Sequence, residues 1–240
     1  MGLKKFIKNT FLRSSENYVV PRNCQIKSLN QIYKQHFGFP SSGFFVEVGA
    51  YDGESFSNTS CLADHGWSGI YIEPIKEFSE KCRKRHKNNR NVKVLNLAAG
   101  IGEQEITIYQ GDTLSTTSED QMNKYKKISW SKHIKFKKQI CIQKPLEKIL
   151  LENDVPLFFD ILVVDVEGKE KEVFDSFDIK KWQPKMLIVE LEDDHPSFKD
   201  DESFIKNIKQ LRSFILRNGY EEIYKDEINT IFKIHKIQGQ

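Results

Sequence analysis

Residues 45–53 read FVEVGAYDG and decide the fold, because an apolar, β-rich run ends there in a turn with two glycines. A buried strand followed by such a turn and a helix is typical of the first unit of a doubly wound α/β sheet, which binds ligands beyond the carboxyl ends of its strands. A dinucleotide fingerprint would place a glycine near position 51, so that the backbone could approach a pyrophosphate. Tyr51 and Asp52 follow instead, and no Gly-Lys-Ser/Thr sequence completes a P-loop. The turn therefore does not fit a nucleotide held by its phosphates.

The carboxylate in this turn favours a cationic ligand. Asp52 would repel a doubly negative pyrophosphate and attract a positive group. S-adenosylmethionine is a ligand of this kind, and it has no phosphate. The alternative is that Gly49 and Gly53 only make a strand-to-helix turn, so the rest of the sequence has to decide.

Strand patterns alternate with helical patterns from residue 43 to residue 191, as in repeated βα units with a mainly parallel sheet. After residue 191 a helix and two strands joined by a turn predict an antiparallel pair. We therefore expect one α/β domain. The expected strands are 44–48, 69–73, 92–97, 161–165, 186–191, 220–224 and 230–235, and the expected helices are about 54–65, 75–87, 145–152, 169–176 and 202–218.

Two segments lie outside this alternation. Residues 1–40 are expected to form a helical arm packed on the domain, which occupies residues 41–240. The arm begins with MGLKKFIKNTFL, whose apolar face is flanked by lysines and would also allow peripheral contact with a membrane surface. From about 110 to 138 a lysine-rich loop insertion interrupts the domain between the short strands EITIYQ and KQICIQ.

The composition excludes several classes of protein. A chain of 240 residues with a net charge of +3 suits one soluble domain and does not indicate a DNA partner. The four cysteines form no CxxC pair, so neither a zinc site nor a disulfide framework is expected. No apolar run reaches the roughly 18–20 residues of a membrane span, and the N-terminus lacks the apolar core of a signal peptide. We therefore expect a cytoplasmic protein without a transmembrane segment.

A second acidic position follows the next expected strand. The stretch GIYIEP ends with Glu73, and Pro74 opens the following helix. An acid at the end of the second strand can accept two hydrogen bonds from a ribose diol, although it could also only cap the helix. The third strand ends in small residues at Ala98 and Ala99, which would leave room for an adenine ring.

Five motifs follow one another between about Gly43 and about Lys233: GFFVEVGAYDGESFSNT, GWSGIYIEP, VLNLAAG, ILVVDVEGKEKEVFDSFD and PKMLIVELE. Taken together and in this order, they resemble the FkbM-type methyltransferases. The resemblance implies an S-adenosylmethionine-dependent O-methyltransferase with a Rossmann-like class I α/β fold. That fold has a seven-stranded, mostly parallel sheet with one antiparallel strand near the C-terminus and helices on both faces. The acceptors that the resemblance implies are saccharide hydroxyls on glycans, lipopolysaccharide or glycosylated metabolites.

The resemblance also implies where the cofactor lies. Glu73 would meet the ribose, Ala98 would meet the adenine edge, and Asn58 would contribute from the early helix. Pro74 would also contact the cofactor. Asp165 would stand beside the transferable methyl group. The residues around the methionine end would be Glu47, Gly49, Ala50, Tyr51, Asp52 and Gly53.

Carboxylates cluster at the ends of the fourth and fifth expected strands. Methyl transfer from a sulfonium is an in-line displacement, in which an enzyme aligns the reacting atoms and a base takes the proton of the hydroxyl. Asp165 and Glu167 are the candidate catalytic acids, and His195 on a later loop is the alternative base. Asp165, Glu190 and Glu192 could instead hold Mg²⁺, which would orient a sugar diol. Of these two hypotheses, the metal-free base is favoured.

The lysine-rich segment is the candidate acceptor surface. Residues 121–138 carry seven lysines and no acid, interleaved with aromatic residues. Lys124 and Trp130 would contact a saccharide or an anionic glycoconjugate, and Ser115 and Thr116 would offer hydroxyls just upstream. The alternative is a solvated face beside a flexible loop.

Two other functions stay open. The ribose 2′-hydroxyl of an RNA or its cap is also an acceptor, although no RNA-binding module is recognisable. The other is a methyltransferase fold that binds without catalysing. The intact Glu47, Gly49, Gly53, Glu73 and Asp165 argue against this second alternative.

Overall fold

The structure is a computed structural model. It describes residues 17–111, 115–117, 119, 122–123, 126–127, 133–192, 194–198 and 201–235.

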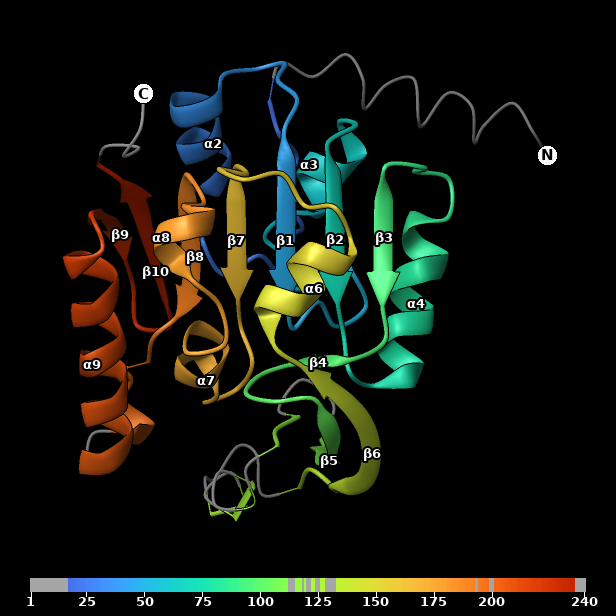
Figure 1. The fold of residues 1–240 in the computed structure, drawn as a ribbon, viewed down its shortest axis with the longest axis vertical. Coiled ribbons are helices and arrows are strands. Elements are labelled where there is room, and N and C mark those ends of the chain that lie inside the picture. The colour runs from blue at the N-terminus through green and yellow to red at the C-terminus, as the bar shows by residue number, and fades with distance from the viewer. Residues whose placement is uncertain are drawn as a thin grey trace.

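A seven-stranded sheet forms the centre of the molecule (Figure 1). The strand order is β3-β2-β1-β7-β8-β10-β9, and β10 runs antiparallel to both of its neighbours while the other pairs are parallel. This confirms the expected mostly parallel sheet with one antiparallel strand near the C-terminus. The strands are β1 Phe44–Val48, β2 Ser68–Ile72, β3 Val92–Leu95, β7 Ile161–Val164, β8 Met186–Glu190, β9 Tyr220–Lys225 and β10 Asn229–Ile234.

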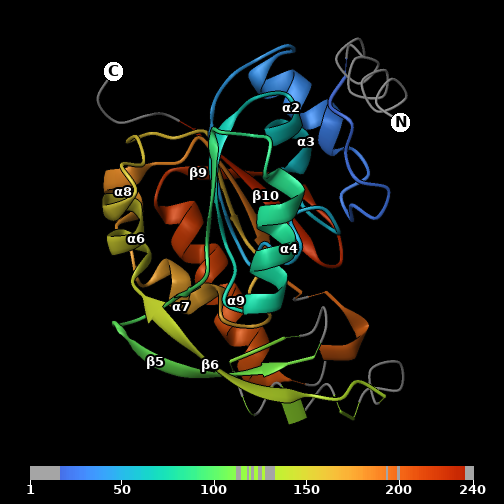
Figure 2. The same ribbon diagram turned by 90° about the vertical axis from the view of Figure 1, so that its right-hand side faces the viewer.

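Helices cover both faces of this sheet, as Figure 2 shows from the side. One face packs on α2 Leu29–Phe37, α3 Ser60–Asp64 and α4 Lys76–His86. The other packs on α6 Leu146–Glu152, α7 Glu170–Phe174, α8 Ile179–Trp182 and α9 Glu202–Arg217. The sequence did not predict α8, which has only four residues. A 3₁₀ turn, η2 Pro196–Phe198, precedes α9.

Alternation along the central strands explains the two cores. In β1, Phe45 points to the face covered by α2 and α3, and Val46 points to the face covered by α6 to α9. All four residues of β7, Ile161 to Val164, are buried because both faces are covered. The continuous apolar runs in the sequence therefore correspond to strands that are buried on both sides.

The expected helix at 54–65 is wrong in its first half, because α3 begins only at Ser60. The preceding residues are held by side chains. The Asp52 carboxylate accepts hydrogen bonds from the backbone N–H groups of Glu54 and Ser55, and the Ser57 hydroxyl accepts them from Thr59 and Ser60. Such local bonds offer the backbone an alternative to helix, so this stretch forms a loop.

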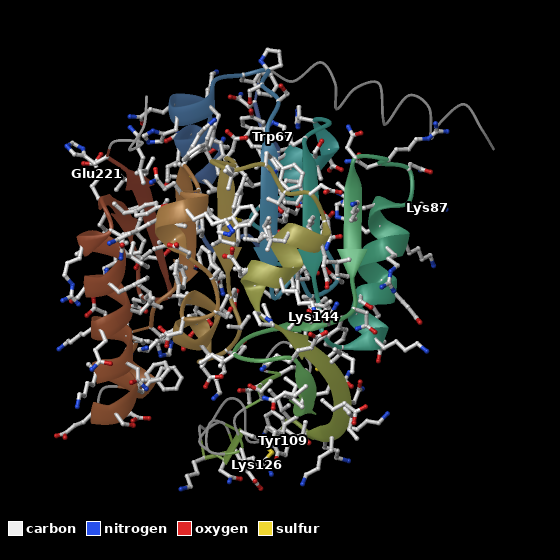
Figure 3. All side chains as sticks on the ribbon, in the orientation of Figure 1. Trp67, Lys87, Tyr109, Lys126, Lys144 and Glu221 are labelled. Carbon is white, nitrogen blue, oxygen red and sulfur yellow. The ribbon has the colours of Figure 1, made fainter. Side chains whose placement is uncertain are left out.

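A second, three-stranded sheet lies beyond the carboxyl ends of the parallel strands (Figure 1). Its order is β4-β6-β5, with β4 Ala98–Ala99, β5 Gln104–Gln110 and β6 Lys137–Lys144. The two short strands expected around the insertion are thus β5 and β6, paired antiparallel. Figure 3 shows Lys144 near the main sheet and Tyr109 and Lys126 at the far end. The small sheet places the insertion over the edge where ligands of this fold bind.

The segment before β1 packs on the sheet. Tyr18, Ile26, Leu29 and Tyr33 are buried in the core on the α2 side. The expected arm also includes residues 1–16, which lie outside the described part of the chain, so its boundary stays a prediction. Within the described residues, no helix has the length and apolar character needed to cross a membrane.

Two neighbouring leucines of α6 test the packing. Leu150 is 0% exposed, whereas Leu151 is 55% exposed. We expect Leu150→Ala to lower the free energy of unfolding by about 2–5 kcal/mol, because it leaves a cavity in the core. Leu151→Ala should change it by less than about 0.5 kcal/mol. Urea unfolding followed by circular dichroism measures both, and equal losses would contradict the burial assigned here.

Candidate functional site

A cavity of about 310 Å³ lies between the carboxyl ends of β1, β2, β7 and β8 and the small sheet. It brings together most of the site residues expected from the sequence. Those that line it are Glu47, Gly49, Ala50, Tyr51, Glu73, Pro74, Ala98, Ser115, Thr116, Asp165, Glu167, Glu190, Glu192 and His195.

Gly49 joins three strands at the floor of this cavity. Its N–H donates to the carbonyl of Ile72, the last residue of β2, at 3.0 Å. Its φ is +88°, and a Cβ atom there would lie 1.6 Å from the carbonyl oxygen of Asp165, just beyond β7. Only glycine permits both this conformation and this approach. The glycine is therefore required for the strand ends to meet.

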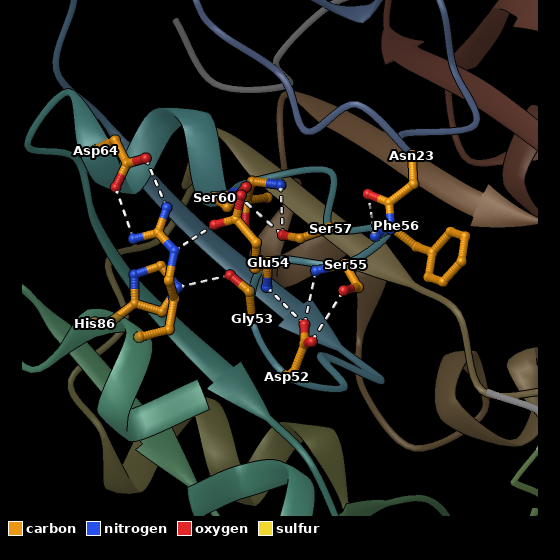
Figure 4. A network of polar contacts seen from close by, with 12 residues as sticks. Asn23, Asp52, Gly53, Glu54, Ser55, Phe56, Ser57, Ser60, Asp64 and His86 are labelled. Atoms are coloured by element: carbon orange, nitrogen blue, oxygen red, sulfur yellow. Dashed lines mark hydrogen bonds and ion pairs between the residues drawn. The ribbon is translucent and has the colours of Figure 1, made fainter. Parts of the chain in front are cut away.

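The turn after β1 is fixed by a network of polar contacts (Figure 4). Besides the backbone N–H groups, the Asp52 carboxylate accepts the Ser55 hydroxyl at 2.9 Å. The Gly53 carbonyl is hydrogen-bonded to the buried ring of His86 at 2.9 Å, and Arg85 beside it pairs with Glu54. Neither Asp52 nor Gly53 lines the cavity. They hold the shape of the turn.

Glu47 is buried at the inner end of the cavity. Its carboxylate accepts hydrogen bonds from the Ser57 hydroxyl at 3.0 Å, the Asn58 N–H at 3.2 Å and the Thr59 hydroxyl. Burial outweighs these bonds and raises the pKa of Glu47 to about 7. Asn58 thus contributes its backbone here, since its side chain is directed to Cys24 and does not line the cavity.

Glu73 directly follows β2, the strand next to β1, and lines the cavity there. Its two carboxylate oxygens accept the N–H groups of Tyr51 at 2.9 Å and Ile75 at 2.8 Å. Burial raises its pKa to about 8. Next to it the cavity has an apolar wall of Pro74, Ile75, Phe78, Ala98 and Ile108, and the rings of Tyr51 and Phe78 pack edge-to-face with centroids 4.4 Å apart.

The carboxyl groups beyond β7 and β8 form an acidic cluster. One oxygen each of Asp165, Glu167 and Glu190 lies within 4.8 Å of the others. Burial raises the pKa of Asp165, and burial together with Asp165 holds the pKa of Glu190 well above its ordinary value. Burial also raises the pKa of Glu192 to about 8. Among the described residues that line the cavity there is no lysine or arginine, so a cation would be the favourable counter-charge.

The remaining expected residues lie at the outer rim. His195 lines the cavity after β8, and Ser115 and Thr116 line it from the segment that follows β5. The Thr116 hydroxyl donates to the carbonyl of Glu167 at 3.1 Å, which ties the insertion to the acidic cluster. Lys124 and Trp130 fall outside the described residues.

Sequence reasoning missed several wall residues, among them Gln25, Phe56, Phe198 and Ile228. Gln25, Phe198 and Ile228 lie outside the quoted motifs, and Phe56 lies in the first motif but has no polar side chain to mark it as a site residue. Only the tertiary structure brings the four together. One signal is visible in the backbone: three wall residues other than glycine have positive φ, namely Tyr51 at 48°, Phe56 at 61° and Glu167 at 55°. Such conformations cost free energy and cluster at functional sites.

Comparisons with known proteins agree with this geometry. The model of the family described as "Methyltransferase FkbM domain" matches residues 47–222. The structure is similar to that of an O-methyltransferase from Bacillus cereus in complex with SAH, with a TM-score of 0.52 and 14% identity over 97% of this chain and 89% of that one. It is also similar to cofactor-bound Rv0187 from MTB, with a TM-score of 0.51 and 10% identity over 97% and 90%. These likenesses show the class I Rossmann-like fold. A search of curated proteins found no match.

The raised carboxyl pKa values predict a pH dependence. An acid such as Glu192, raised from 4.5 to about 8, keeps its proton in the folded chain where the unfolded chain has lost it. Stability from this group is therefore present below its ordinary pKa and is lost as the pH rises toward about 8. The urea concentration at the unfolding midpoint should fall between about pH 5 and about pH 8.5 in both the unchanged protein and Glu192→Gln. It should fall less for Glu192→Gln than for the unchanged protein. Parallel pH curves for the two proteins would refute this.

Proposed function

Since the chain belongs to the FkbM family of S-adenosylmethionine-dependent methyltransferases, we propose that it methylates a hydroxyl group of a saccharide. The observation that carries the proposal is the single cavity that holds Glu47, Glu73 and Asp165 at the ends of three adjacent parallel strands. The bound cofactor supplies an activated methyl group. The chain has to bind it, align an acceptor and exclude water.

The cavity walls fit such a cofactor. Glu73 would accept the ribose diol, and the apolar wall that contains Ala98 and Phe78 would hold the adenine. Glu47 and the turn from Gly49 to Tyr51 would surround the methionine end, with Asp52, Gly53 and Asn58 holding that turn in place. The fit rests on charge. The cavity has buried carboxyl groups, and no lysine or arginine is among its described lining residues, so it suits the positively charged sulfonium and ammonium groups of the cofactor.

The acidic cluster is proposed to accept the proton of the hydroxyl. Asp165 and Glu190 interact closely, and their pKa values are raised, so the ionised form is a strong base. Glu167 would help to orient the acceptor. His195 is the alternative base at the rim. Ser115 and Thr116 would contact the acceptor from the segment that follows β5.

A metal-assisted form is the second candidate mechanism. The ligand oxygens of Asp165, Glu167 and Glu190 are close enough to hold one ion. The set expected from the sequence had Glu192 in place of Glu167. Mg²⁺ there would orient a diol and lower the pKa of its hydroxyl. We retain the metal-free base as the first proposal, because carboxyl groups that share a proton can lie together without an ion while one of them stays ionised and acts as the base.

Calorimetry tests the cofactor proposal. Glu73→Ala should weaken binding of S-adenosylmethionine about tenfold or more, because hydrogen bonds from the ribose to a carboxylate are lost. Glu77→Ala, on the exposed face of α4, is the matched control and should bind normally. If the unchanged protein does not bind S-adenosylmethionine at millimolar concentration, the proposed function is contradicted. Normal binding by Glu73→Ala would remove Glu73 from the ribose site.

Transfer of labelled methyl groups tests the reaction. The protein is incubated with labelled cofactor and separate glycan, lipid and RNA fractions of a cell extract, and we expect label in glycans. Asp165→Asn should lower kcat by about 100- to 10,000-fold, whereas His195→Ala should leave most activity. Label in RNA alone would favour the ribose 2′-hydroxyl. Binding without any label would favour a binding protein. Loss of activity with a chelator, restored by Mg²⁺, would establish the metal-assisted form.

A further inference from the structure

Three consecutive side chains before β1 form hydrogen bonds with two separate parts of the chain beside the cavity, the loop before α3 and the start of β10. The Asn23 side-chain oxygen accepts the N–H of Phe56 at 3.3 Å (Figure 4). The Cys24 thiol donates to the side-chain oxygen of Asn58 at 3.9 Å. The Gln25 side-chain oxygen accepts the Asn229 amide at 2.9 Å. We call residues 23–25 the clip. Ile26, which is fully buried, anchors it to the core.

The clip reaches the acidic side of the cavity. Asn229 is the first residue of β10 and pairs with Glu190 of β8. The strand that leads to Glu73 is β2, three positions away from β8 in the sheet. Neighbouring strands lie about 4.8 Å apart, so these ends are separated by roughly 14 Å. Gln25 therefore lies on the side proposed for the acceptor, away from the ribose side.

The contact with Asn229 uses the oxygen of the Gln25 amide and leaves its NH₂ group as a hydrogen-bond donor. The same contact fixes the orientation of the amide, and its NH₂ group has no hydrogen-bond partner among the described residues. Gln25 is an exposed residue that lines the cavity, so this donor is accessible to water and to an acceptor that enters. Gln25 lines the cavity, and so do Glu167, Glu190 and Glu192. The carboxyl groups can accept hydrogen bonds from hydroxyls, while the amide can donate to an oxygen. Together they match an uncharged group that both donates and accepts, and they disfavour an anion.

We propose that Gln25 is a specificity-determining residue that donates a hydrogen bond from its side-chain amide to an oxygen of the methyl acceptor, and that the part of the acceptor entering the cavity is uncharged and polyhydroxylated. This rests on the proposed methyl transfer and deepens it. Gln25 precedes residues 47–222, the range matched by the family model, so the residue is supplied by the segment before the shared domain.

Two substitutions separate the amide donor from the rest of the side chain. Gln25→Ala removes the whole group, whereas Gln25→Glu keeps an oxygen for Asn229 and replaces the NH₂ donor with a carboxylate oxygen, which also adds a negative charge. Lys27→Ala is the matched control, because Lys27 is exposed, lies two residues away and does not line the cavity. The probe is the extract fraction that takes up labelled methyl from the unchanged protein.

Both Gln25 variants should raise the apparent KM for this fraction about 3- to 10-fold, with kcat and the Kd for S-adenosylhomocysteine unchanged. Lys27→Ala should behave as the unchanged protein. Normal KM in Gln25→Glu would overturn the donor role. Equal weakening of S-adenosylhomocysteine binding would place the clip in the cofactor site and also overturn it.

The charge of the product tests the second part. After hydrolysis of the labelled product, we expect the methylated unit to pass an anion exchanger without retention. A retained, phosphorylated or acidic unit would overturn the uncharged acceptor. Failure of the saccharide proposal has a different signature: label would then enter RNA or lipid, and the same Gln25 variants would be measured with that fraction.

Discussion

The close approach of Gly49 to the backbone of Asp165 is the constraint on which the site depends. A side chain at position 49 would occupy the space of the Asp165 carbonyl, so the ends of β1 and β7 could not meet. Their meeting brings Glu47 and Asp165 to one cavity, and the bond from the Gly49 N–H to Ile72 adds the end of β2 and with it Glu73. A single missing Cβ atom thus allows three carboxyl groups from distant parts of the chain to face one ligand.

Those carboxyl groups determine the electrostatics of the cavity. Each is removed from water, and burial is the main cause of the raised pKa values of Glu47, Glu73, Asp165 and Glu190. Without a positive ligand, these carboxyl groups tend to bind protons, which neutralise their negative charge. A cationic cofactor can take over this role, which links the buried carboxyl groups of the cavity to methyl transfer from a sulfonium.

The sequence predicted the parts of the site that lie at strand ends. Apolar runs locate β2 and β7, and the first acid after each run, Glu73 or Asp165, must lie at the carboxyl edge because the strands are parallel. The start of α3 was not predictable from apolar spacing, since hydrogen bonds to Asp52 and Ser57 replace the first helical turn. Gln25 was missed for another reason. Its place depends on a contact with Asn229, 204 residues away, which no local pattern encodes.

The first and last strands of the small sheet in the sequence, β4 and β6, pair with each other where the small sheet meets the domain. Ala98 and Ala99 of β4 pair with Gln143 and Lys144 of β6, so the chain leaves and re-enters the domain at one point. Residues between these pairs can lengthen or shorten at the far tip without moving the entry and exit, because loop closure costs little per added residue. The roof of the cavity can therefore change in length and sequence while the seven-stranded sheet and the strand ends below it keep their positions.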